Sequence, residues 1–99
     1  MVKKALFVKL EAKPGKEAEL EAFLRSALPL AQKEPDTTTW YALRFGPSTF
    51  GIYDTFADEA GRQAHVNGEI AKALFARAGE LLAGTPNIEQ VDVLEAKLP

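Results

Sequence analysis

The chain has 99 residues, a hydrophobic fraction of 46%, a charged fraction of 26% and a net charge of −2 at pH 7. These values are typical of one folded domain over residues 1–99, and they argue against a disordered tail or a basic surface that binds nucleic acid. The chain has no cysteine, which excludes disulfides, thiol nucleophiles and thiolate metal sites.

The first half of the chain predicts a strand, a broken helix and a second strand. Residues 3–12 alternate between two faces, which is typical of a strand. A helical pattern begins at Lys16, and Pro29 is expected to kink or end this helix because proline lacks an N–H. The helix terminus is marked near Pro35. Residues 37–45 are rich in β-branched and aromatic side chains and predict the second strand.

The second half of the chain predicts a hairpin, two short helices and a last strand. Residues 46–48 have turn composition, so residues 49–56 are expected to pair antiparallel with the strand before them. Asp58 is a plausible N-cap of a helix that runs to Val66. A second helical stripe runs from Ile70 to Leu82, and the last strand spans residues 88–95.

This β-α-β-β-α-β order predicts an α+β, ferredoxin-like sandwich, in which helices cover one face of a four-stranded antiparallel sheet. The strands at residues 3–12 and 37–45 carry apolar or aromatic groups on both faces. Because one helix layer covers only one face, the sequence predicts a homodimer that packs sheet against sheet.

Two residues are candidates for acid–base chemistry. His65 is the only histidine, and its ordinary pKa of about 6.5 suits it to carry a proton near neutrality. Asp54 shares a strand face with apolar neighbours, so burial demands a partner, for which His65 and Arg44 are the candidates. The alternatives are a half-buried helix histidine with one hydrogen bond and a structural ion pair at Asp54.

Four more residues are candidates for substrate binding. Arg44 would stabilise an oxyanion in a dry site, or it is a solvated or interface charge. Trp40, Tyr53 and Phe56 would form aromatic walls for a flat ligand, or they pack in the core or a dimer interface. Tyr53 lies on the opposite strand face from Asp54, so the two share a pocket only if a bulge intervenes.

Several segments together resemble the antibiotic biosynthesis monooxygenase family, the quinol monooxygenase-like group of dimeric α+β barrel proteins. The strongest is the strand FGIYDTF at residues 50–56, followed by Asp58-Glu59 and Gln63-Ala64-His65. The others are Lys13-Pro14-Gly15-Lys16 before a glutamate-rich helix, and the aromatic strand from Trp40 to Arg44. Asp54 and Phe56 stand where the family more often has glutamate and tryptophan. Val8 and Phe75 stand near the asparagine and histidine positions of its haem-degrading branch.

The resemblance implies a dimeric α+β barrel that acts as a cofactor-independent monooxygenase on an electron-rich aromatic such as a quinol. In this hypothesis His65 deprotonates the substrate and Asp54 orients His65. The residues expected to bind the ring are Trp40, Arg44, Tyr53 and Phe56. The alternatives are a cofactorless isomerase or lyase of a small carbonyl compound, and a non-catalytic dimeric module that binds a ligand.

Cofactors, metals and membranes are not expected. One histidine without cysteine cannot build a two-histidine triad or a structural zinc site, and the glycine motifs of phosphate and dinucleotide loops are missing. Ser26 and Ser48 lack the setting of a hydrolase nucleophile. No apolar stretch approaches the roughly 20 residues that span a bilayer, and no signal peptide is evident. The expected location is therefore the cytoplasm.

Overall fold

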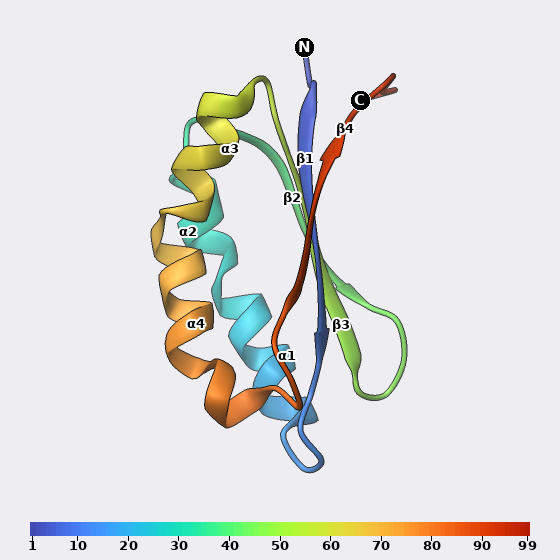
Figure 1. The fold of residues 1–99 in the computed structure, drawn as a ribbon, viewed down its shortest axis with the longest axis vertical. Coiled ribbons are helices and arrows are strands. Elements are labelled where there is room, and N and C mark those ends of the chain that lie inside the picture. Colours follow the sequence, from blue (N-terminus) through green and yellow to red (C-terminus); the bar gives the residue numbers. More distant parts are fainter.

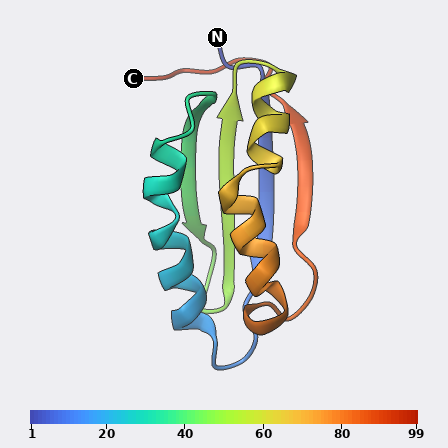
Figure 2. The same cartoon turned by 90° about the vertical axis from the view of Figure 1, so that its left-hand side faces the viewer.

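The computed structural model describes all 99 residues and arranges them in two layers (Figure 1). One layer is an antiparallel sheet of β1 (Lys4–Glu11), β2 (Thr37–Arg44), β3 (Thr49–Phe56) and β4 (Asn87–Asp92). The other contains α1 (Glu17–Ser26), α2 (Leu28–Gln32), α3 (Glu59–Val66) and α4 (Glu69–Leu81). The strand order is β2-β3-β1-β4, and the helices lie on one face of the sheet (Figure 2). The predicted α+β, ferredoxin-like arrangement is confirmed.

Each helical half of the fold consists of two helices. The first half breaks at Ala27, and Pro29 lies in the first turn of α2, where its missing N–H would have no partner inside the helix anyway. The Asp58 side chain accepts a hydrogen bond of 2.9 Å from the Gly61 N–H and caps α3, as predicted. None of the helices is long and apolar enough to cross a membrane.

The last strand is shorter than predicted. β4 ends at Asp92, which pairs with Lys4 at the start of β1, whereas the sequence predicted a strand to residue 95. Val93 still donates one backbone hydrogen bond of 2.9 Å to Lys3. No backbone hydrogen bond between strands follows at residues 94–95, so the predicted extension over these residues is wrong.

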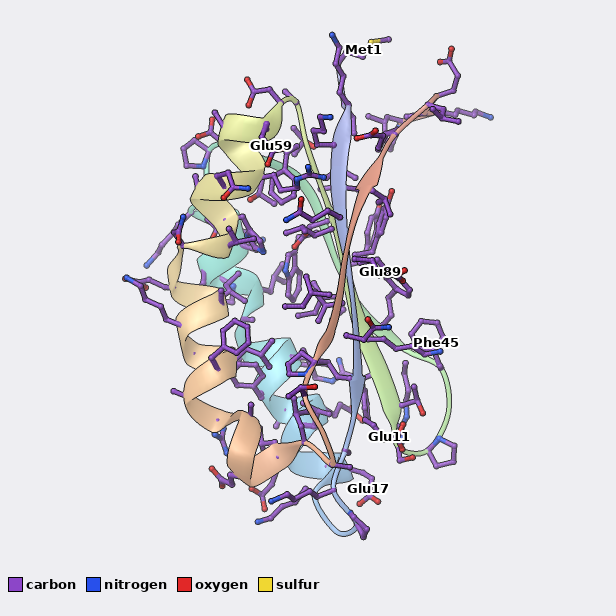
Figure 3. The ribbon with its side chains drawn as sticks, in the orientation of Figure 1. Met1, Glu11, Glu17, Phe45, Glu59 and Glu89 are labelled. Carbon is purple, nitrogen blue, oxygen red and sulfur yellow. The ribbon has the colours of Figure 1, made fainter.

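The hydrophobic core lies between the sheet and the helices (Figure 3). Leu20 of α1 and Leu81 of α4 are completely buried there, opposite Leu10 of β1 and Phe50 of β3. Alternation along β3 turns Phe50, Ile52, Asp54 and Phe56 to the helix side, and all four are buried. Asp54 therefore enters the core because its neighbours at two-residue spacing are apolar.

The other face of the sheet carries aromatic side chains that no helix covers. Tyr41 and Phe45 are about half exposed, and Figure 3 shows Phe45 on the side away from the helices. The rings of Tyr41 and Tyr53 stack with centroids 6.4 Å apart, and those of Phe7 and Phe45 meet edge to face at 6.1 Å. We call this surface the open face; its apolar character is the one that the sequence predicted.

Candidate functional site

His65 lies between two carboxylates at the boundary of the helices and the sheet. It belongs to the last turn of α3 and is buried, with its ring 5.4 Å from that of Phe56. Its Nε2 lies 2.9 Å from Oδ2 of Asp54, and its Nδ1 lies 2.6 Å from Oε1 of Glu34. The partner of His65 on the sheet is therefore Asp54, while Arg44 is bound elsewhere.

Asp54 is the most deeply buried member of this group. Its side chain is 1% exposed, and its strand neighbour across the sheet is Trp40. The His65 N–H does not point along the 2.9 Å contact, so both oxygens of Asp54 lack a well-directed hydrogen-bond donor. The indole N–H of Trp40 is likewise buried without an acceptor. Buried polar groups are seldom left unpaired, and a catalytic role is one explanation for such an exception.

Glu34 is a member of the site that sequence reasoning missed. It lies in the turn between α2 and β2, 31 residues before His65, where it was seen only as part of a helix terminus. The Thr37 hydroxyl donates a hydrogen bond of 2.7 Å to the same Oε1 that contacts His65. No periodicity relates two residues on separate elements, so only the folded chain shows this contact.

The two carboxylates set the protonation of His65. Burial by itself lowers the pKa of the imidazole, but the contacts with Asp54 and then Glu34 outweigh it and raise this pKa to about 9. Burial raises the pKa of Asp54, and the contact with His65 only partly opposes that rise. A short Nδ1–Oε1 distance fits a charge-assisted hydrogen bond, so near neutrality the ring is a cation.

A small apolar cavity adjoins Asp54 and His65. Its volume is about 60 Å³, and its wall consists of side chains from β1, β3, α3, α4 and β4. Asp54 and His65 are the only polar residues among those that line it. Phe75 and Ile88 also line the cavity, yet they are 54% and 43% exposed, so they form its mouth between α4 and β4.

The predicted aromatic residues occupy three different settings. Phe56 is completely buried against the His65 ring, and Trp40 packs half-buried against the core beside Asp54 on the sheet. Tyr53 lies on the open face, as expected from the alternation of side chains along β3. Phe75, which lies within the helical stretch predicted from Ile70 to Leu82, is the aromatic residue at the cavity mouth.

Arg44 lies apart from His65, at the β2–β3 hairpin. Its guanidinium pairs with Glu21 of α1 at 3.0 Å and donates to the carbonyl oxygens of Gly46 and Pro47. It lines a separate hollow of about 180 Å³ that shares no residue with the cavity at Asp54. The structure thus brings His65 and Asp54 together and leaves Arg44 outside their site.

The acidic and imidazole groups of the site do not surround a common point. Asp54 and Glu34 approach opposite nitrogens of the His65 ring, and no set of three such residues is arranged to hold a metal ion. The arrangement instead suits the holding of a proton on Nδ1, because this nitrogen is hydrogen-bonded to Oε1 of Glu34 at 2.6 Å.

Comparisons with known proteins place this fold in context. A protein of unknown function from Nitrosomonas europaea is 68% identical, with all of this chain and 96% of that chain covered and a TM-score of 0.98. Two candidate antibiotic biosynthesis monooxygenases share the fold. The one from Nitrosomonas europaea is 15% identical, covers 93% and 90% of the two chains and has a TM-score of 0.82. The one from Caulobacter crescentus is 23% identical, covers 95% and 92%, and has a TM-score of 0.76.

No protein-family model matches the sequence, and the search of curated proteins found no match. The similarity to known proteins therefore rests on the solved structures. They include candidate antibiotic biosynthesis monooxygenases, so the resemblance seen in the sequence is confirmed at the level of the fold.

Proposed function

Because this chain belongs to the same family as the Nitrosomonas europaea protein of unknown function, and has the fold of candidate antibiotic biosynthesis monooxygenases, we propose that it is a cofactor-independent monooxygenase of an electron-rich aromatic such as a quinol. The observation that carries this proposal is the Asp54–His65 pair at the edge of an apolar cavity. A base and a fixed cation beside a dry space are what deprotonation of a hydroquinone requires.

The roles in the pair follow from their protonation. His65 is already protonated near neutrality, because its pKa is raised to about 9, so it is poorly suited to accept a proton. Asp54 has oxygens without donors, and its raised pKa makes it a stronger base than an exposed carboxylate. We therefore assign the base to Asp54 and the stabilisation of the resulting oxyanion to His65.

The overall reaction balances without a bound cofactor. A hydroquinone loses a proton to Asp54, and the anion supplies the electrons that reduce dioxygen. One oxygen atom enters the ring and the other leaves as water, so that hydroquinone and dioxygen give hydroxyquinone and water. The proton on Asp54 returns in the formation of that water. The residues of this chain bind the hydroquinone, remove its proton and stabilise the anion that results.

The cavity volume limits how a substrate binds. About 60 Å³ is roughly the space of two water molecules, whereas a dry cavity of about 150 Å³ is known to hold benzene. An aromatic ring therefore rests at the mouth, against Phe75 and Ile88, and only its hydroxyl-bearing edge reaches Asp54. Trp40 and Phe56 act from behind the site, as packing for the strand and the imidazole.

A direct test is the consumption of oxygen by purified protein with a series of small hydroquinones. Consumption is expected with the wild type and is expected to fall at least tenfold in Ala71→Leu, because Ala71 lines the cavity beside its mouth. The matched control is Ala76→Leu, on the exposed side of α4 and away from the cavity, which is expected to retain activity. No oxygen consumption by the wild type with any hydroquinone would contradict the proposal.

The small cavity also favours a second candidate, a cofactorless isomerase or lyase of a small carbonyl compound. A three- or four-carbon substrate would enter more fully than a ring, and Asp54 would abstract a proton beside its carbonyl while His65 stabilises the enolate. The two candidates differ in their need for oxygen. Turnover of a small carbonyl compound under nitrogen would favour the second.

We further propose that the protein works as a homodimer joined through the open face. The support is the cluster of half-exposed aromatic side chains there, among them Tyr41 and Phe45. Tyr41→Lys is expected to shift the mass measured by analytical ultracentrifugation from two chains to one. The control is Leu28→Lys, which changes an exposed apolar residue on the helix side. A wild type that sediments as one chain at high concentration would contradict this assembly.

A further inference from the structure

The Glu34–His65 contact has features that a simple surface ion pair lacks. The Nδ1–Oε1 distance is 2.6 Å, and the His65 side chain is 8% exposed. The Glu34 side chain is 21% exposed, compared with 1% for Asp54, so the ring separates a buried carboxylate from one that reaches solvent. Such a contact in a partly dry setting is stronger than an exposed pair.

Glu34 is itself held in place. The Thr37 hydroxyl donates to its Oε1 at 2.7 Å, which fixes the same oxygen that faces His65. At Gly68 before α4, an added Cβ would come within 3.2 Å of Oε2, so the absence of a side chain there leaves room for the carboxylate. The orientation of Glu34 therefore depends on both the α2–β2 turn and the α3–α4 junction.

No other charged group competes for Nδ1 of His65. Asp54 from β3 faces the opposite nitrogen, and Asp36 from the α2–β2 turn lines the same small hollow as His65 without bonding to it. The residues of α4 that line the cavity beside His65 are apolar. On α3 itself, Arg62 is occupied by Glu59 and by the carbonyl oxygens of Ala5 and Val91.

We propose that Glu34 is a positioning residue that keeps His65 in its doubly protonated, cationic form, so that Asp54 alone acts as the base at the cavity. This inference rests on the proposed function, because it assigns how that site divides its roles. With a proton fixed on Nδ1 by Glu34, the cationic ring also carries a proton on Nε2, the nitrogen that lies 2.9 Å from Oδ2 of Asp54. A substrate proton then passes to Asp54, and the developing oxyanion meets a permanent positive charge.

The single histidine allows a test that needs no substrate. Its ring resonances can be followed by NMR as the pH is varied, without overlap from other histidines. The midpoint is expected near 9 in the wild type and below about 8 in Glu34→Gln, which keeps the shape but removes the charge. Glu34→Asp is expected to restore part of the shift. The control Asp36→Asn is expected to leave the midpoint unchanged.

A second readout separates this role from a purely structural one. With hydroquinone as the probe, the rate in Glu34→Gln is expected to fall with rising pH from a lower pH than in the wild type, because the imidazolium is lost earlier. A variant that merely loosens the fold would lower the rate at every pH alike. If Glu34→Gln does not fold, Thr37→Val leaves the carboxylate and removes its anchor, and a smaller fall of the NMR midpoint is expected.

The outcomes distinguish a failure of the role proposed for Glu34 from a failure of the monooxygenase proposal. An unchanged His65 midpoint in Glu34→Gln, with the protein folded, overturns the role of Glu34 whatever the activity. A lowered midpoint without oxygen consumption by the wild type supports the charge-holding role of Glu34 and contradicts the monooxygenase proposal instead. Both results are obtained from the wild type and Glu34→Gln.

Discussion

Two clusters of charged residues lie where the helices meet the sheet, and they differ most in how deeply their side chains are buried. Asp54, His65 and Glu34 meet where α3 and the α2–β2 turn face the sheet, whereas Arg44 and Glu21 meet at the β2–β3 hairpin. In the first cluster the side chains are 1%, 8% and 21% exposed. In the second, Arg44 is 52% and Glu21 35% exposed.

The difference shows how strongly burial changes the properties of charged side chains. In the exposed cluster, water and salt screen the charges and little energy depends on them. In the buried cluster the apolar surroundings strengthen each contact and raise the pKa of Asp54, which has no well-directed hydrogen-bond donor. The contacts of His65 with Asp54 and Glu34 raise the pKa of His65 and outweigh the opposite effect of burial. Four predictions sharpen this comparison, from the largest expected effect to the smallest.

The largest effect is expected in the pH dependence of stability. Because the pKa of His65 rises from its ordinary 6.5 to about 9 on folding, the stabilisation is complete below about 6.5 and is lost as the pH rises through about 9. The free energy of unfolding, measured in urea, is expected to fall by about 3 kcal/mol over this range. His65→Gln should flatten the fall, and Glu21→Gln should retain it; a flat wild-type curve would refute the raised pKa.

Removal of the base comes next. Asp54→Asn preserves the shape of the side chain but removes its charge, and the rate of hydroquinone oxidation is expected to fall by at least about 100-fold, the usual worth of a general base. Oxygen consumption measures it, and circular dichroism checks that the variant folds. Full activity in a folded Asp54→Asn protein would exclude Asp54 as the base.

A matched pair of glutamate variants compares the two clusters directly. Glu34→Gln is expected to cost about 2 kcal/mol of unfolding free energy at neutral pH, because it weakens a charge-assisted hydrogen bond in a partly buried site. Glu21→Gln is expected to cost less than about 1 kcal/mol, because its pair with Arg44 is exposed. Equal costs, measured by urea unfolding, would show that burial does not separate the clusters.

The smallest effect is expected at Arg44. The hollow at Arg44 shares no residue with the cavity at Asp54. Arg44→Gln should therefore change the KM for hydroquinones by less than about twofold. A tenfold change would correspond to about 1.4 kcal/mol. The rise in KM is read from oxygen consumption at several substrate concentrations. A tenfold increase would return Arg44 to the substrate site, where the sequence had suggested it.

Much of the fold was open to prediction because it depends on local patterns. Two-residue alternation fixed which side of β3 faces the helices and so buried Asp54, and Asp58 marked the start of α3. The length of β4 was predicted wrongly, because the end of a strand depends on where its partner β1 begins. His65 and Asp54 were predicted as a pair, though with Arg44 as a rival partner for Asp54.

The sequence by itself therefore determined the order of the elements and the faces of the strands. These features follow from the spacing of apolar side chains along one element. Only the tertiary structure decided that Glu34 reaches His65 across 31 residues, that Phe75 and Ile88 frame a cavity, and that Arg44 stays outside. Those facts depend on how separate elements pack against one another. The periodicity of apolar residues within one element does not specify its distance from another element.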